Sequence, residues 1–154
     1  MKVSVLILQQ QWSFSRVIID SMQNILVTSA GKRVVLVELF KRALKACDQA
    51  AKVYTTDLNP ELAPAGIASD KCFRVPRVLS SDYISILLNI CVRNNIGMVI
   101  PTIDTELLVL SQNKQKFYDK GIALIISDFS FIQLCRDKRN TAIFFHEIGI
   151  RIPA

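Results

Sequence analysis

From residue 24 onwards, short apolar runs alternate with longer stretches in which hydrophobic residues recur at helical spacing. Each run is four or five residues long and is followed by polar or turn-forming residues. This is the pattern of a strand buried on both faces of a parallel sheet. The predicted strands cover residues 24–28, 52–56, 72–75, 97–100 and 122–126.

The stretches between these runs have the pattern of amphipathic helices, with apolar residues three or four positions apart. In the first, Val37, Phe40, Leu44 and Cys47 fall on one face, and basic residues occupy the other. Side chains that accept a hydrogen bond from a helix N–H mark helix starts. Further helices are predicted after Ser80 or Ser81, after Asp104, over 130–135 and over 138–148, before Gly149.

The regular alternation of strand and helix indicates βαβ units with right-handed crossovers. Asn59, Pro60 and Pro64 interrupt it and predict an irregular loop after the second strand. The sequence therefore predicts an α/β fold, an open, Rossmann-like, three-layer domain with a parallel sheet of about five strands. This domain spans residues 24–150, with no internal repeat and no linker.

Residues 1–23 do not continue this pattern. They contain one apolar run, residues 3–8, which is too short for the hydrophobic region of a signal peptide. The run could be an extra strand, or it could pair across a symmetric interface and form a homodimer. Alternatively, the natural start is Met22, and the upstream residues are an extension outside the domain.

Composition supports a globular domain, with 51% hydrophobic and 21% charged residues. No apolar run approaches the roughly 20 residues that a membrane-spanning helix needs. The formal net charge of +6 could indicate a nucleic-acid partner, but the basic residues are scattered and form no arm. Nucleic-acid binding is therefore a minor alternative.

The four cysteines are far apart, form no C-x-x-C pair, and are accompanied by a single histidine, His146. This argues against a zinc site and against a disulfide framework. Three of the cysteines lie in or after apolar stretches and are predicted to be small core residues. A reducing, cytoplasmic environment is expected.

In an open parallel sheet, ligands bind beyond the carboxyl ends of the strands. The first predicted strand ends in a polar loop that contains Ser29, Gly31, Lys32 and Arg33. Gly31 permits close approach of the backbone, and a helix N-terminus offers N–H donors to an anion. An ordinary turn glycine followed by solvated basic residues explains the loop equally well. It matches neither a P-loop nor the dinucleotide motif G-x-G-x-x-G.

Two further polar positions lie at the same edge. Asp57 ends the second strand, where a Rossmann enzyme keeps its ribose-binding acid, although a loop-bracing role is also open. Thr102, Asp104 and Glu106 follow the fourth strand; they could grip a ligand, or Asp104 could cap a helix that Glu106 favours. No nucleophile–base pair can be assembled, since His146 lies on a predicted helix away from these loops.

Five segments together resemble the N-terminal (pre-ATP-grasp) domain of ATP-grasp enzymes, in the carbamoyl-phosphate-synthase-large-subunit-like branch of carboxylate–amine ligases. Their order and spacing carry the resemblance, which covers residues 24–154. The segments are I-L-V-T-S-A-G-K-R at 25–33, T-D-L-N-P at 56–60, A-S-D-K-C-F-R-V-P at 68–76, V-I-P-T-I-D-T-E at 99–106 and C-R-D-K-R-N-T-A-I-F-F-H-E-I-G-I-R-I-P at 135–153.

The resemblance implies a ligase that makes an acyl-phosphate from ATP and a carboxylate and then passes the acyl group to an amine. Mg²⁺ would neutralise phosphate charge in that reaction. Lys138 falls where the family often places a contact to the ATP phosphates, and loops 28–33 and 101–106 fall where the first domain shapes the substrate pocket. Residues 151–154 would begin the connection to an ATP-grasp domain.

By the same resemblance, the family's metal-binding carboxylates, glycine-rich loop and adenine pocket lie beyond Pro153. We therefore expect residues 1–154 alone to have no catalytic or metal-binding residues and no tight affinity for ATP. The alternatives are a stand-alone Rossmann-like module that binds a nucleotide or dinucleotide and, less favoured, a basic nucleic-acid-interaction domain.

Overall fold

The structure is a computed structural model that describes residues 24–151. Its centre is a five-stranded sheet in the order β3-β2-β1-β4-β5, and every neighbouring pair is parallel. The strands are β1 (Asn24–Thr28), β2 (Val53–Asp57), β3 (Lys71–Arg74), β4 (Ile96–Pro101) and β5 (Ala123–Leu124). The predicted α/β class and five parallel strands are confirmed, although β5 is shorter than predicted.

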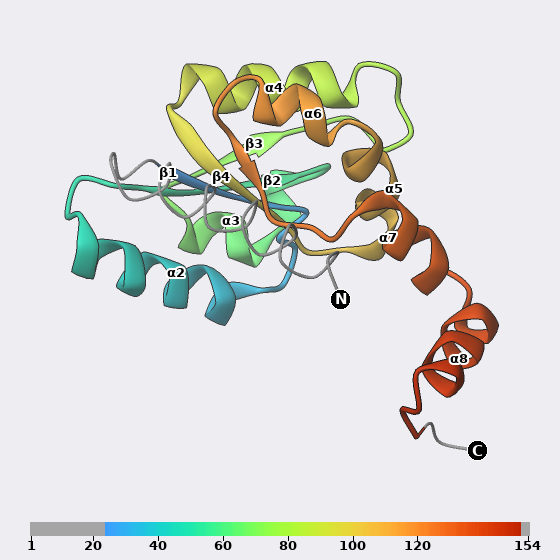
Figure 1. Ribbon diagram of the computed structural model, residues 1–154. Helices are drawn as coiled ribbons and strands as arrows, with labels where there is room; N and C mark the ends of the chain where they lie inside the picture. The colour runs from blue at the N-terminus through green and yellow to red at the C-terminus, as the bar shows by residue number, and fades with distance from the viewer. Residues whose placement is uncertain (1–23, 152–154) are drawn as a thin grey trace.

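Helices cover both faces of this sheet, as right-handed crossovers between parallel strands require. Figure 1 shows two of them on one face, α2 (Val34–Cys47) and α3 (Pro64–Ala68). On the opposite face lie α4 (Tyr83–Arg93) and α6 (Lys114–Tyr118). The described chain contains three further α-helices, α5 (Asp104–Gln112), α7 (Phe129–Cys135) and α8 (Lys138–Glu147).

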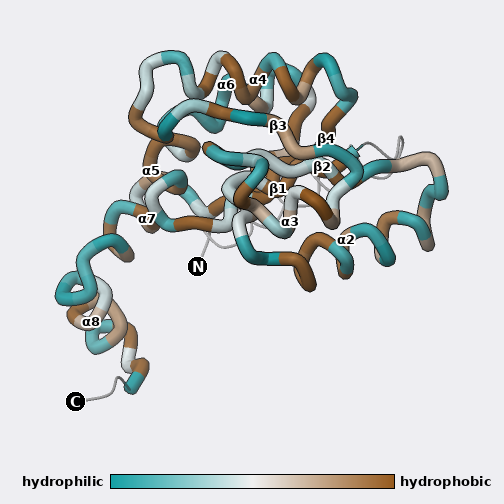
Figure 2. Tube along the Cα trace, turned by 180° about the vertical axis from the view of Figure 1, so that it is seen from behind, coloured by the Kyte–Doolittle hydropathy of each residue, from teal (hydrophilic) through white to brown (hydrophobic). Residues whose placement is uncertain are grey.

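Side chains of β1 alternate between the two helical layers, as the pleat of a strand requires. Leu26 belongs to the core beneath α4, whereas Ile25 and Val27 belong to the core beneath α2. Both cores exclude solvent at β1, since the side chains of Leu26 and Val27 are wholly buried. In Figure 2, hydrophobic and hydrophilic segments alternate along α2, which therefore presents one face to the sheet and the other to solvent. The three-layer architecture is confirmed.

The loop predicted around Pro60 and Pro64 is wrong, because this segment contains helix α3 and a short 3-10 helix, η1 (Pro60–Leu62). Each proline occupies the first turn of its helix, where its missing N–H would have no intrahelical partner. Proline here starts a helix instead of breaking one. Gly66 in α3 is buried against β3, with Cys72 beside it.

Two predicted helix caps are also wrong. Helix α4 begins later than Ser80 or Ser81, with Asp82 at the N-cap and no side-chain cap bond. Asp104 is the first residue of α5 and its side chain makes no cap bond, since Ile103 occupies the N-cap. Among the described helices, the only side-chain cap belongs to Asp137, which accepts a hydrogen bond from the Arg139 N–H before α8.

The cysteine prediction holds in part. Cys91 is buried and Cys72 is half-buried, but Cys47 and Cys135 are exposed, and all four are free thiols. Burial raises the pKa of the Cys91 thiol to about 12. Within residues 24–151 no helix has the length and apolar character to cross a membrane.

The last two helices extend from the body of the domain. Helix α7 packs against α5, and α8 packs against α7 but buries none of its own residues. An edge-to-face pair joins the two, with the ring centroids of Phe131 and Phe144 6.2 Å apart. Figure 1 shows α8 beyond α7, on the side away from the sheet. Residues 1–23, with the run at 3–8 and Met22, and residues 152–154 lie outside the described residues.

Candidate functional site at the switch point of the sheet

The chain order of the strands creates a switch point between β1 and β4. From β1 the chain moves outward through β2 to β3, and then returns to place β4 on the other side of β1. In open α/β sheets, ligands bind outside the carboxyl ends of the strands at such a point. Thr28 and Pro101 are paired in register there, so the loops that follow β1 and β4 start side by side.

Hydrogen bonds to the backbone hold the loop that follows β1. The Thr102 hydroxyl lies 2.9 Å from the carbonyl oxygens of both Thr28 and Ser29. From the other side, Thr56 accepts a hydrogen bond from the Ser29 N–H at its Oγ1 (3.3 Å) and one from the Ala30 N–H at its carbonyl (3.2 Å). The loop is thus fixed to both strands that flank β1.

This loop turns sharply through left-handed backbone conformations. Ser29 has a φ of +48° and Gly31 a φ of +51°. Glycine adopts this region without a steric cost, whereas a residue with a Cβ atom does so at roughly 1–2 kcal/mol. Ser29 is therefore the strained position of the loop.

A buried carboxylate lies directly behind the loop. Glu106 of α5 is wholly buried and accepts three hydroxyl hydrogen bonds. Thr28 Oγ1 donates to Oε2 at 2.6 Å, Tyr83 Oη donates to Oε1 at 2.9 Å, and the Ser29 hydroxyl also donates to Oε1. Such bonds offset the large cost of burying a charge. Tyr83 remains the donor, because burial, and then the charge of Glu106, raise the Tyr83 pKa far above its usual value.

The remaining predicted residues of these loops have other environments. Lys32, Arg33 and Asp104 are exposed at the same edge of the sheet. Asp57 Oδ1 accepts a hydrogen bond from the Asn59 N–H at 2.9 Å, so its carboxylate braces its own loop. Gly31 also supports a neighbouring segment, since its carbonyl accepts a 3.0 Å hydrogen bond from the Ala65 N–H.

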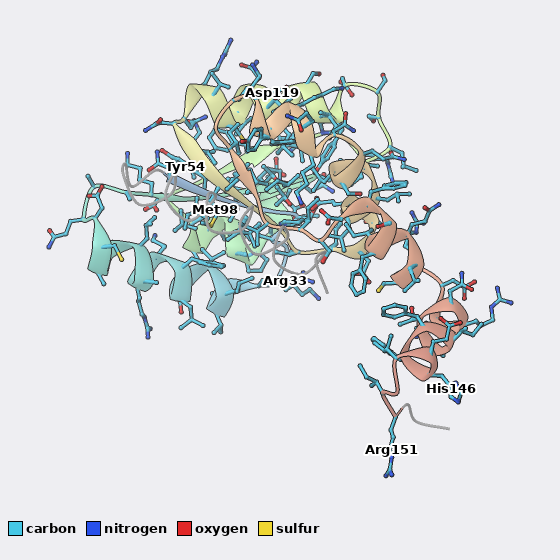
Figure 3. All side chains as sticks on the ribbon, viewed as in Figure 1. Arg33, Tyr54, Met98, Asp119, His146 and Arg151 are labelled. Atoms are coloured by element: carbon cyan, nitrogen blue, oxygen red, sulfur yellow. The ribbon has the colours of Figure 1, made fainter. Side chains whose placement is uncertain are left out.

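The structure therefore brings Ser29, Thr102 and Glu106 together, whereas Lys138 lies on α8, which packs against α7. Lys138 is exposed at the first position of α8. In Figure 3, His146 on the same helix is well separated from Arg33, which follows β1. Within residues 24–151, no group of histidine, cysteine, aspartate and glutamate is arranged to hold a metal ion.

Three participants, Thr28, Thr56 and Tyr83, are not among the individual residues predicted for the site, although Thr28 lies in the predicted loop 28–33. Two of them carried a usable signal. Thr28 follows Leu26 by two positions, so both side chains point to the same face of the sheet. Tyr83, Leu87 and Cys91 are four positions apart, which places the Tyr83 ring on the buried stripe of α4. The contact with Glu106 itself has no local signal, because it joins residues 23 positions apart.

Comparison with known proteins identifies one family. The model of the PylC-like, N-terminal domain matches residues 25–125, and the chain belongs to this family. None of the curated proteins matches the sequence. The match, together with the structural neighbours, confirms the resemblance to the pre-ATP-grasp domain of ATP-grasp enzymes.

Solved structures share the fold at low sequence identity. The biotin carboxylase domain of a single-chain bacterial carboxylase has a TM-score of 0.57 and 11% identity, covering 85% of this chain and 30% of its own. A multifunctional pyruvate carboxylase from Rhizobium etli has a TM-score of 0.55 and 11% identity, covering 86% and 13%. The bicarbonate-bound biotin carboxylase domain of a thermophilic 2-oxoglutarate carboxylase has a TM-score of 0.56 and 13% identity, covering 84% and 29%. The chain thus spans less than a third of these proteins.

Proposed function

We propose that this chain is the N-terminal domain of an ATP-dependent carboxylate–amine ligase that acts through an acyl-phosphate. The PylC-like N-terminal match carries the proposal, because it runs from Ile25 in β1 to the end of β5 and includes both polar loops. The narrower assignment, to the carbamoyl-phosphate-synthase-like branch, rests on the five sequence segments alone.

In this proposal, loops 28–33 and 101–106 form one wall of the substrate pocket. The exposed cations Lys32 and Arg33 attract the carboxylate of the substrate, while exposed Asp104 can pair with an amine. Ser29, Gly31, Thr102 and Glu106 set the shape of the wall, and Asp57 braces the loop next to it. The domain orients a substrate and performs no bond-making step.

ATP and Mg²⁺ would be held mainly by a downstream ATP-grasp domain. Among residues 24–151, no three histidine, cysteine, aspartate or glutamate side chains are grouped as a metal site, which supports a metal site in the downstream domain. The family resemblance places one phosphate contact on this chain, at Lys138. The exposure of Lys138 and the extension of α8 from the body of the domain are compatible with a contact to a second domain. We expect residues 1–154 alone to be inactive. We also expect the protein to be cytoplasmic. Pairing of residues 3–8 across a symmetric interface would give a homodimer.

Two measurements test this proposal. Calorimetry of residues 1–154 with Mg·ATP should show no micromolar affinity. A micromolar Kd would contradict the proposal that ATP is held mainly by a downstream domain. The reading frame continued past Ala154 should encode a protein that converts ATP to ADP only with a carboxylate present. Hydroxylamine should trap its acyl-phosphate as a hydroxamate. A stop codon directly after Ala154 would contradict the ligase.

A stand-alone nucleotide-binding module is the second candidate, because the strand order is that of a Rossmann-like sheet and Asp57 ends β2. Two observations weigh against this candidate. The Asp57 carboxylate already accepts a hydrogen bond from the Asn59 N–H, and the first loop has a single glycine where the dinucleotide motif has three. Quenching of protein fluorescence on titration with NAD would favour this module. Salt-dependent retention of DNA would favour the nucleic-acid alternative instead.

A further inference from the structure

We propose that Glu106 is a positioning residue that acts through Ser29 to hold the loop after β1 in its left-handed conformation. The significance of that loop for a ligand rests on the proposed function. The positioning itself is a property of this chain, and it can be measured without a substrate.

The direction of neighbouring side chains carries the argument. Thr28 and Ser29 are consecutive, and in a continuing strand their side chains would point to opposite faces of the sheet. Yet both hydroxyls donate to the carboxylate of Glu106, Thr28 to Oε2 and Ser29 to Oε1. The turn of Ser29 to φ +48° allows this, so the carboxylate binds both hydroxyls only when the loop is left-handed. Glu106 therefore favours that conformation over an extended one.

Glu106 itself is fixed from another part of the fold. Tyr83, the first residue of α4, donates to Oε1 at 2.9 Å and is buried with it. The carboxylate is therefore held by α4 and α5 together and can impose a position on the more exposed Ser29. Its complete burial also prevents direct contact with a ligand, so its influence must pass through Ser29.

The consequence of the Ser29 turn reaches the rest of the loop. The Ser29 N–H donates to Thr56 Oγ1, and the Ser29 carbonyl accepts from the Thr102 hydroxyl. Two residues later, the Gly31 carbonyl accepts a hydrogen bond from the Ala65 N–H in the first turn of α3. Lys32 and Arg33 follow immediately and are exposed. The direction in which these two cations leave the backbone is thus set by the conformation that Glu106 selects.

The test is amide hydrogen exchange and backbone NMR on residues 1–154 carrying Glu106→Leu, Ser29→Ala or both. Leucine has no acceptor atom, so the Ser29 hydroxyl loses its partner, as do the hydroxyls of Thr28 and Tyr83. We expect exchange of the Ser29 and Ala30 amides to accelerate about tenfold, a loss typical of one charge-assisted bond. The chemical shifts of residue 29 should move toward extended values. At these amides the double variant should add little to Glu106→Leu, because that change already removes the Ser29 contact.

Two variants serve as controls. Glu38→Gln changes an exposed acid on α2 and should leave these amides unchanged. Tyr83→Phe removes a donor from Glu106 but keeps the Ser29 contact, so it should lower global stability while residue 29 stays left-handed. If Glu106→Leu does not fold, Ser29→Ala decides: an unchanged shift and exchange at residues 29–31 would overturn the proposal. A further acceleration at the Ser29 and Ala30 amides when Ser29→Ala is added to Glu106→Leu would overturn it as well. Neither result depends on whether the protein is a ligase.

Discussion

Thr102 and Ser29 join the two polar loops across the switch point of the sheet, with the Thr102 hydroxyl 2.9 Å from the Ser29 carbonyl oxygen. The same hydroxyl lies 2.9 Å from the Thr28 carbonyl. A hydroxyl has one proton, so these two carbonyls share a single donor. The loop after β1 therefore depends on a residue of the β4 loop for its backbone hydrogen bonding.

Replacing Thr102 by valine should destabilise the domain. Thr102→Val keeps the shape of the side chain but removes the donor, leaving two partly buried carbonyls without it. We expect a loss of about 1–3 kcal/mol in the free energy of unfolding, measured by urea denaturation. Thr105→Val, at an exposed position of the neighbouring α5, should stay within about 0.5 kcal/mol of the wild type. Equal losses in the two variants would contradict the bridging role of Thr102.

Tyr83 should make stability depend on alkaline pH. The Tyr83 pKa is raised in the folded state, first by burial and then by the charge of Glu106. Above about pH 10, the unfolded chain loses the tyrosine proton while the folded chain keeps it. The unfolded state then binds fewer protons, and stability falls as the pH rises. Below that pH the stabilisation is fully present.

Urea denaturation of wild type and Tyr83→Phe between pH 8 and 11 tests this dependence. At pH 8 the variant should be less stable by roughly 1–2 kcal/mol, because Glu106 loses a donor. Toward pH 11 the difference should shrink. Burial raises the pKa of Cys91 to about 12, so its thiol also lowers stability at alkaline pH. This contribution is the same in wild type and variant, and it cancels in the difference between their free energies of unfolding. A difference that stays constant over this pH range would show that Tyr83 titrates normally in the fold.

The order of elements could be read from the sequence because the runs are short, apolar and regularly spaced. The strand at 24–28 was predicted with the bounds of β1, since a buried parallel strand needs a continuous apolar run. The sequence does not predict helix α3, because Pro60 and Pro64 have the pattern of helix breakers, although each stands at a helix start. Local sequence does not distinguish these two roles of proline.

The sequence predicts individual residues of the candidate site but not the contacts between them. Ser29, Thr102 and Glu106 were selected because they follow strands whose carboxyl ends share one edge. Their mutual contacts depend on β4 lying beside β1, and the bond from Thr28 to Glu106 joins residues 78 positions apart. No local pattern specifies such a pairing. The neighbouring acid Asp104, predicted as a cap, instead takes the first helical position with its side chain exposed.

Gly66→Ala should destabilise the domain even though alanine is the better helix former. In a solvent-exposed helix interior the change would stabilise by roughly 1 kcal/mol. Here a Cβ atom would lie 2.9 Å from Cys72 Sγ and 3.0 Å from Cys72 Cβ. Overpacking of this kind typically costs about 1–3 kcal/mol, so the melting temperature should fall. In a Cys72→Ala background the loss should be smaller, because the sulfur is gone. A rise in melting temperature for Gly66→Ala alone would contradict the close packing of α3 on β3.

Phe144→Ala should release α8 from the domain without loosening the sheet. No residue of α8 is buried, so its order depends on the Asp137 cap, on the contact between Phe144 and Phe131 of α7, and on a long hydrogen bond (3.4 Å) from the Thr141 hydroxyl to the Leu134 carbonyl. An isolated helix of ten residues is too short to be stable in water. Hydrogen exchange in α8 should therefore become fast in the variant, while exchange in β1 and β4 stays slow. Ile143→Ala, a change at an exposed position of the same helix, is the matched control and should leave most of the α8 protection in place. If Phe144→Ala left α8 as protected as in the wild type, the helix would be held by contacts other than this aromatic pair.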